Sequence, residues 1–426
     1  MAVRKAAGGR IAFCAVLTIG EFRVMWLADF LSSMGDQFAR VALAVLVFDR
    51  TDSAALTGLV YALTFVPAVL GALTLSSTAD RRSRRAVMVT ADAFRAIVVA
   101  TMVVPGVPLA GLCLLVAIMS FLGGPYKAAQ LALLRDVLHA EQYPAGMALR
   151  QITNQAAELA GFGLGGILSA SFSPQICLGV DLATFAASAL LVGCFVQSRP
   201  AASPSGRNHS ITAGAKMLWG EPRQRAIVLT TVLGLFYIAP DGLAAPYTAQ
   251  LGYGSTMVGF VLASGGAGAI LVLPLFLRFV PAGRRPVALP IACLAAGLPL
   301  TLVPVGGGIY VAIFLFAATE AIWSVQVVMS VSFLAELLPD SHRAQGMGLA
   351  GSMNITAQGL GIGLAGLAGQ ATSPSIAIGL SGAASVLVAL WPSALLARSR
   401  TIRRTVSGRA GPKSPIIIAN DDRTEG

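Results

Sequence analysis

Twelve stretches of this chain are apolar over about the 20 residues that a helix needs to cross roughly 30 Å of hydrocarbon. Hydrophobic residues make up 56% of the sequence and charged residues only 12%, whereas soluble domains carry about 25% charged residues. A soluble chain could not bury so much apolar surface, so we predict an all-α integral membrane protein with twelve transmembrane helices. The predicted spans are residues 22–48, 54–78, 86–104, 109–134, 145–170, 175–196, 225–250, 256–280, 286–304, 309–335, 344–369 and 375–396.

The second half of the chain repeats the first with a shift of 200 residues. The stretch from Asn154 to Pro174 recurs as Asn354 to Pro374, and Gly146-Met147 upstream matches Gly346-Met347 in the same register. We therefore predict two pseudo-symmetric six-helix bundles. A doubled unit in a membrane chain is the usual construction of a secondary transporter. The predicted segments are an N-terminal segment 1–21, bundles 22–197 and 223–397, a polar linker 198–222 and a disordered tail 398–426.

The net charge of +11 is concentrated in alternate connections between the predicted spans. Arginines follow helices 2 and 8, fill the linker and open the tail, while the other connections carry almost none except Arg50. This asymmetry follows the positive-inside rule, so it predicts a cell-membrane protein with both termini and the linker in the cytoplasm. The charge reflects topology, and we expect no nucleic-acid partner.

The connection between helices 2 and 3 reads TADRRSRRAVM and contains Asp80, Arg81, Arg84 and Arg85. It resembles the major facilitator superfamily, whose pattern here is G-x-x-x-D-R-x-G-R-R, although this chain has Ser76 and Ser83 where the family usually has Gly. The upstream stretches FRVMWLADFLSSMGD and TDSAALTGL look like the drug- and siderophore-exporting branch of that superfamily.

The resemblance implies the major facilitator fold around a central cavity and alternating access. It also implies export of a small amphipathic drug or secondary metabolite in exchange for protons, by a chain that works as a monomer in the lipid bilayer. A siderophore or other metabolite exporter is the alternative within transport. A non-transporting membrane scaffold or receptor is the alternative outside transport, and the intramembrane acids argue against it.

The resemblance further implies that Asp80, Arg81, Arg84 and Arg85 form a conformational latch in the outward-facing state. The alternative is a basic loop that only fixes topology. The corresponding connection of the second half, PAGRRP, keeps two arginines but lacks the acidic residue.

Predicted helix 5 carries glycines in the pattern G-F-x-x-G-G, which resembles the antiporter motif G-P-x-x-G-G with Phe162 in place of Pro. The alternative is a stripe of small residues that lets two helices pack closely. Because helix 11 keeps glycine at the positions that correspond to Gly161 and Gly166, we favour packing. These glycines are Gly161, Gly165, Gly166, Gly361, Gly363 and Gly366.

Ionisable side chains within the spans are few, and each costs roughly 2.5–3.5 kcal/mol on insertion scales. They bind protons and substrate, or they join helices within the bundle. Spacing allows Asp36 to pair with Arg40 and Asp92 with Arg95. Glu158 has no cation nearby in the sequence, and its repeat mate is the neutral Gln358. The candidates for proton or substrate binding are Asp29, Asp36, Arg40, Lys127, Glu158, Asp241 and Glu320.

Lys127 is suited to countering an anionic substrate, or equally to pairing with Asp36 or Glu158. The sequence contains no GxxxxGK[ST] loop, no HExxH and no nucleophile elbow. We therefore expect no enzyme activity, no metal and no cofactor, with a proton gradient as the energy source and a small molecule as substrate.

Overall fold

The computed structural model describes residues 15–139, 141–199, 216, 218–339 and 343–409, without the side chains of 76–81, 282, 344 and 397–409. Within these residues the chain is helical and has no strand. The helices of the N-terminal half are α2 (Gly20–Thr51), α3 (Ala54–Ala62), α4 (Val66–Arg81), α5 (Arg84–Val103), α6 (Leu109–Val137), α7 (Tyr143–Ser171) and α8 (Pro174–Phe195).

The C-terminal half contains a matching set of long helices and several short ones. Its elements are α10 (Pro222–Val232), α11 (Gly234–Tyr237), α12 (Ala239–Gln250), α13 (Ser255–Phe279), η1 (Ala282–Arg284), α14 (Arg285–Ala295), α15 (Leu298–Thr301), η2 (Val303–Val305), α16 (Gly308–Leu337), α17 (Arg343–Ala371) and α18 (Pro374–Arg409). Taken together, the elements cover the twelve predicted spans. Ten helical stretches among the described residues are long and apolar enough to cross a membrane.

Three predicted spans are not single helices. Span 2 is divided between α3 and α4, span 7 between α10, α11 and α12, and span 9 between α14, α15 and η2. The expectation of uninterrupted helices is wrong there because Pro67, Pro240 and Pro299 each occupy the second position of a new segment. A proline has no N–H to donate and disfavours helical backbone in the residue before it.

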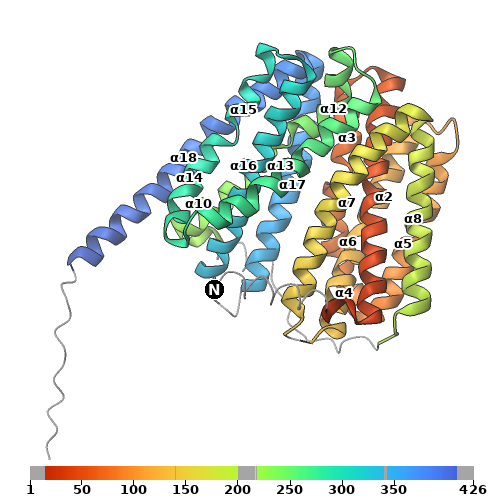
Figure 1. Ribbon diagram of the computed structural model, residues 1–426, viewed down its shortest axis with the longest axis horizontal. Helices are drawn as coiled ribbons and strands as arrows, with labels where there is room; N and C mark the ends of the chain where they lie inside the picture. The colour runs from red at the N-terminus through yellow and green to blue at the C-terminus, as the bar shows by residue number, and fades with distance from the viewer. Residues whose placement is uncertain (1–14, 140, 200–215, 217, 340–342, 410–426) are drawn as a thin grey trace, which may run out of the picture.

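Connections between helices alternate between two ends of the bundle. We call the end that carries residues 52–53, 104–108, 172–173, 251–254, 306–307 and 372–373 the loop end, and the opposite end, where α2 begins and α18 finishes, the terminal end. The two halves lie side by side, with α3 and α12 at the loop end (Figure 1). Within the N-terminal half α2 packs on α7 and α8. Within the C-terminal half α13 packs on α16.

The most extensive contacts between the two halves are those of α7 with α13 and of α3 with α17, and α3 also packs on α12. A Cβ on Gly166 would lie 2.7 Å from the Gly259 Cα, and a Cβ on Gly58 would lie 2.9 Å from the Gly366 Cα. All four glycines lie within about two helical turns of the loop end. Gly166 and Gly366 are 200 residues apart and Gly58 and Gly259 are 201 apart, so the repeat places both contacts symmetrically.

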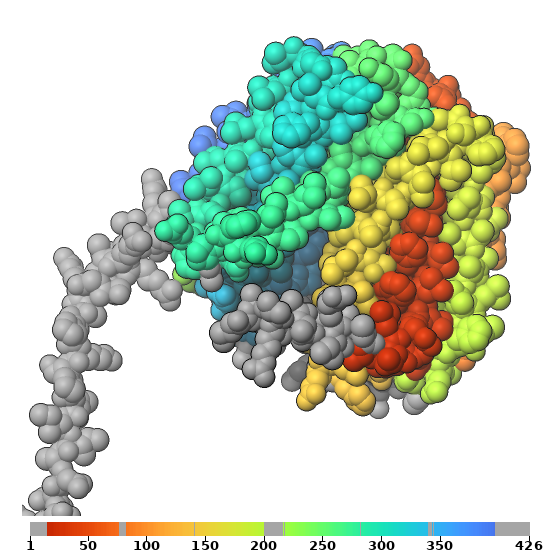
Figure 2. All heavy atoms as spheres, viewed as in Figure 1, coloured from red at the N-terminus to blue at the C-terminus, as the bar shows by residue number. Residues whose placement is uncertain are grey.

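The apolar core also differs between the two ends. Toward the loop end one buried cluster joins both halves, with Val41 and Phe162 from the first and Leu243 and Ile362 from the second. Toward the terminal end the halves have separate clusters, one around Leu133 and one around Leu334. The space-filling view shows the surface hollowed between the halves on the terminal side (Figure 2). The molecule is therefore closed at the loop end.

Large apolar side chains are exposed on the outer surface of both halves, as expected of a surface that faces lipid tails. Examples on five different helices are Leu73, Phe94, Leu190, Leu271 and Phe314.

Candidate functional site

Four ionisable side chains from both halves form what we call the central cluster: Arg40, Glu158, Asp241 and Glu320. They come from α2, α7, α12 and α16, and each is partly exposed. Asp241 lies within electrostatic range of Arg40 and Glu158, and Glu320 lies within range of Asp241 and Glu158. The fold thus brings together four residues that are separated by up to 280 positions, 320 − 40, in the sequence.

Arg40 is held against the break in span 2. Its guanidinium carbon lies 5.1 Å from the ring centroid of Phe65 and 5.9 Å from that of Tyr61, within the distance at which a cation is attracted to an aromatic face. Its Nη1 donates a 3.3 Å hydrogen bond to Gln37 Oε1. The expected pairing of Asp36 with Arg40 is wrong, because Asp36 pairs with Arg95 on α5 instead.

Asp241 occupies the first turn of α12, directly after the break that follows Tyr237. The free N–H groups at a helix N-terminus favour negative charge, so the interrupted span provides a favourable position for this carboxylate inside the membrane. Discontinuous helices near the bilayer midplane commonly form ligand and ion sites in transporters. The sequence predicts Asp241 as a candidate residue, but it does not predict the break before it.

The Glu320 side chain on α16 packs against α13 at Gly265, which has no side chain of its own. A Cβ on Gly265 would lie 2.7 Å from the Glu320 Cγ, so any larger residue there would displace the glutamate.

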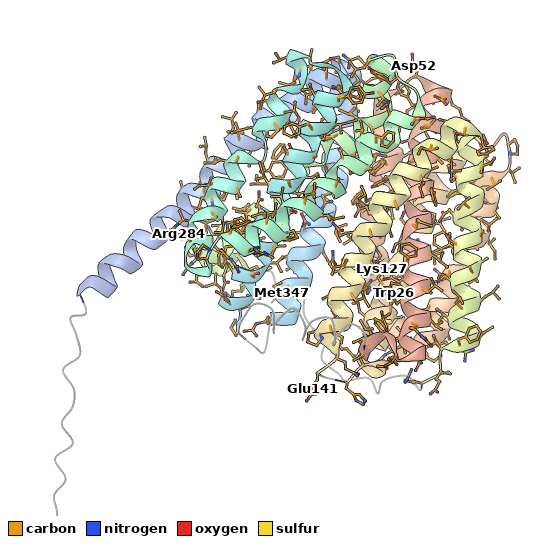
Figure 3. All side chains as sticks on the ribbon, in the orientation of Figure 1. Trp26, Asp52, Lys127, Glu141, Arg284 and Met347 are labelled. Atoms are coloured by element: carbon orange, nitrogen blue, oxygen red, sulfur yellow. The ribbon has the colours of Figure 1, made fainter. Side chains whose placement is uncertain are left out.

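Lys127, on α6, has an exposed side chain and lies at the level of Trp26 in the middle of the N-terminal half (Figure 3). Its charged neighbours include Asp36 and Arg40.

The remaining predicted acid, Asp29, is not part of the central cluster. It is 5% exposed and accepts a 2.8 Å hydrogen bond from Arg150 Nε on α7. Arg150 Nη2 also donates to Gln130 Oε1 at 2.8 Å, so three helices are joined through one guanidinium. Arg150 is not among the residues predicted from the sequence. Its position inside the predicted span 145–170 could have identified it, because a basic residue in a membrane span needs an acidic or polar partner.

A second group of charges lies within the N-terminal half, and we call it the buried cluster: Asp36, Asp92, Arg95 and Asp181. Arg95 Nη2 lies 2.6 Å from Asp36 Oδ1 and Nη1 lies 3.4 Å from Asp92 Oδ1, so the predicted pairing of Asp92 with Arg95 is present. The Arg95 guanidinium also stacks 3.9 Å from the Phe185 ring centroid. Asp181 is not among the candidate residues that the sequence predicts.

The C-terminal half presents a polar cluster near the break in span 7. A Cβ on Gly234 would lie 2.9 Å from Trp323 Cζ2 and 3.0 Å from Asn354 Oδ1. Tyr237 donates a 2.8 Å hydrogen bond to the Cys293 carbonyl, and its ring lies 6.2 Å from that of Trp323. Gln358, the repeat mate of Glu158, contacts Gly234 as well.

The latch residues can be placed only in part. Arg84 forms an ion pair with Asp136 at the end of α6 and also donates to the Ala132 carbonyl at 3.2 Å. Arg85 donates a hydrogen bond to the Gly193 carbonyl of α8. Both arginines therefore join helices within the N-terminal half in this conformation. The side chains of Asp80 and Arg81 lie outside the described residues.

The glycines of the predicted motif lie where helices approach closely. A Cβ on Gly161 would lie 2.8 Å from Gln37 Cβ, and one on Gly165 would lie 3.1 Å from Phe38 Cδ1, both on α2. A Cβ on Gly361 would collide with the Leu235 carbonyl, whereas one on Gly363 would lie 3.9 Å from Ala62 Cβ. Gly166 packs against Gly259 and Gly366 packs against Gly58, so these two glycines lie at contacts between the halves.

A family model described as Major Facilitator Superfamily matches residues 25–325, which is well over half of the chain. The chain belongs to the Major Facilitator Superfamily. The family consists of transporters rather than enzymes, and this membership accounts for the multi-pass helical architecture. A search of curated proteins gives no match.

Solved structures with the same fold share little sequence with this major facilitator protein. The nucleoside transporter NupG is similar at 16% identity and a TM-score of 0.70, over 87% of this chain and 98% of that one. A peptide transporter, POT, solved with sulfate has 13% identity and a TM-score of 0.70, over 89% and 94%. A bacterial homologue of the human lysosomal transporter Spinster, inward-facing and unoccupied, has 13% identity and a TM-score of 0.64, over 88% and 96%. These likenesses show the fold alone.

Proposed function

We propose that this secondary transporter is a proton-coupled antiporter that exports a small amphipathic drug or secondary metabolite. The observation that carries the proposal is the composition of the central cluster, in which three carboxylates from two halves are accompanied by Arg40, with Lys127 as a second cation near Glu158. Ionised acids at membrane depth are costly when they lack partners. The cluster is therefore balanced by taking up protons or by binding a cationic group.

The position of the cluster supports exchange between its two kinds of occupant. Glu158 belongs to one half, whereas Asp241 and Glu320 belong to the other, so movement of the halves changes the distances between these carboxylates. A proton and a substrate that compete for the same carboxylates cannot both be bound, and this competition couples their movements in opposite directions. The apolar groups of an amphipathic substrate would contact the half-buried ring of Phe65 beside Arg40.

We further propose that the protein works as a monomer in the cell membrane with both termini and the linker in the cytoplasm. With that orientation the loop end faces outward, and the conformation closed there is inward-facing. The arginines at the terminal end, including Arg84 and Arg85, support this orientation through the positive-inside rule.

Proteoliposomes with an imposed pH gradient test the proposal, with a lipophilic cationic dye as the transported probe. We expect the dye to move against the proton flow and to stop when the gradient is collapsed. Glu158→Gln, Asp241→Asn and Glu320→Gln should each abolish gradient-driven accumulation. Glu141→Gln, in the exposed connection at the terminal end (Figure 3), is the control and should behave as the wild type.

Two outcomes would contradict the proposal. Dye movement that persists unchanged after the gradient is collapsed would exclude proton antiport. Wild-type accumulation by all three central variants would show that the central carboxylates do not couple transport.

A further inference from the structure

The buried cluster holds three carboxylates against one guanidinium, and one of these carboxylates has no partner. Asp181 is fully buried, and among the described residues neither of its carboxylate oxygens has a hydrogen-bond partner. The nearby Thr184 hydroxyl donates to the Asp181 backbone carbonyl at 2.7 Å. A buried carboxylate that accepts no hydrogen bond is strongly disfavoured in its charged form.

The Asp181 carboxyl points toward α2 beside Asp36. A Cβ on Gly35 would lie 2.6 Å from Asp181 Oδ1, so the carboxyl occupies space that only glycine leaves free. The charged groups facing it are Asp36 on α2 and Asp92 and Arg95 on α5. From α6, Tyr126 reaches the cluster through a 3.5 Å contact between its hydroxyl and Ser188 Oγ.

Arg95 has a donor to spare within the same cluster. Its Nη groups bind Asp36 and Asp92, while its buried Nε has no described hydrogen-bond partner. Asp92 has a second partner, because Ser188 Oγ donates to its Oδ2 at 2.5 Å. Asp92 is thus fixed by two contacts. The single positive charge of Arg95 is already shared between Asp92 and Asp36, so it does not balance a third ionised carboxylate, whereas its Nε leaves a donor for Asp181 when Asp36 is neutral.

We propose that Asp181 is a proton-binding residue outside the central cluster, and that Asp36 and Asp181 exchange one proton while Arg95 exchanges partners between them. In this conformation Asp181 holds the proton and Arg95 pairs with Asp36. In the transfer the O–H bond of Asp181 breaks, a new O–H bond forms on an Asp36 oxygen, and Arg95 moves to the Asp181 carboxylate. The net charge of the cluster is the same before and after the transfer.

Asp36 is the member of the buried cluster that lies nearest to solvent and to Lys127. Its side chain is 22% exposed, whereas the Arg95 side chain is 6% exposed, and Lys127 is among the charged groups near Asp36. A proton that reaches Asp36 can therefore leave to water, while one on Asp181 cannot. The site requires no transport through the central cluster, so it stands independently of the antiport proposed above.

Infrared spectroscopy of the purified full-length protein at neutral pH tests the site through the C=O stretching band of protonated carboxylic acids. Asp181→Asn, which has nearly the shape of the protonated acid, should remove one such band. Asp36→Asn should remove the same band, because a neutral residue 36 releases Arg95 to Asp181, which then gives up its proton. Asp29→Asn is the control, because Asp29 pairs with Arg150 outside the buried cluster and its replacement should leave the band of Asp181 unchanged.

The result that overturns proton binding is an acid band that persists unchanged in Asp181→Asn. A band that disappears in Asp181→Asn but persists in Asp36→Asn overturns the exchange of partners. Circular dichroism and size-exclusion profiles like those of the wild type confirm that the variants are folded before the spectra are compared.

Discussion

Gly166 of α7 and Gly259 of α13 pack backbone against backbone, so that a Cβ on Gly166 would lie 2.7 Å from the Gly259 Cα and 2.9 Å from the Thr256 carbonyl oxygen. This contact, with its symmetry-related counterpart between Gly58 and Gly366, holds the two halves together at the loop end. Separating the halves there must break both contacts. Substitutions at these glycines should therefore change the balance between conformations more than the stability of either half.

Gly166→Val should open the loop end. Overpacking costs about 1–3 kcal/mol, which changes the ratio of the two conformations by roughly fivefold to 150-fold. The measurement is the labelling rate of a cysteine introduced at buried Ala245 by a membrane-impermeant maleimide, with the five native cysteines replaced. Gly163→Val is the matched control, because a Cβ there meets nothing within 4 Å. Equal rates in both variants would show that the glycine contact does not hold the loop end closed.

Gln370→Leu should open the loop end more weakly. Gln370 Oε1 accepts hydrogen bonds from Ser53 Oγ at 3.0 Å and from the Ala55 N–H at 3.4 Å, across the two halves. A hydrogen bond contributes about 0.5–1.5 kcal/mol net, and less where it is exposed, so we expect labelling at residue 245 to rise by roughly threefold. Gln250→Leu is the control, since Gln250 binds Ser375 within the C-terminal half. An effect of equal size in the control would refute a specific link between the halves.

Arg150→Met should lower the melting temperature strongly, because it leaves buried Asp29 without its partner. Removing one member of a buried pair costs about 3–5 kcal/mol. The double variant Asp29→Asn/Arg150→Gln should recover much of that loss, as measured by thermal unfolding in detergent, and should retain dye transport. If the stable double variant does not transport, Asp29 takes part in transport beyond joining helices.

Asp80→Asn should favour the conformation described here if the connection after α4 is a latch for the outward-facing state. A cysteine at half-exposed Leu131, one helical turn from Lys127 on α6, reports access from the terminal end. We expect its labelling rate to rise. Arg82→Gln in the same connection, whose side chain is exposed, is the control. An unchanged rate in Asp80→Asn would favour the reading of a basic connection that only fixes topology.

The boundaries of the spans were predictable because each apolar segment must satisfy its own backbone hydrogen bonds in lipid, which fixes helix type and length locally. The observed α5 and α13 begin and end within a few residues of the predicted 86–104 and 256–280. The three interrupted spans were not predicted. A proline at the second position of a new helix is compatible with a kink or a break, and packing decides between them.

The candidate site was predictable as a set of residues but not as an arrangement. Mid-span position singled out Glu158, Asp241 and Glu320, and the structure brings these three together. The same reasoning grouped Asp29 and Asp36 with them, whereas the structure pairs Asp29 with Arg150 and Asp36 with Arg95. Spacing along one helix favoured Arg40 as the partner of Asp36, but Arg40 extends toward the rings of span 2 instead.

The sequence by itself determined that this chain is a doubled bundle of membrane-spanning helices, because hydrocarbon imposes length and composition on each segment separately. Only the tertiary structure decided which charges share a neighbourhood and at which end the halves close. Those features depend on contacts between residues far apart in the chain, such as Gly166 with Gly259 and Asp36 with Arg95, and no local pattern specifies such contacts.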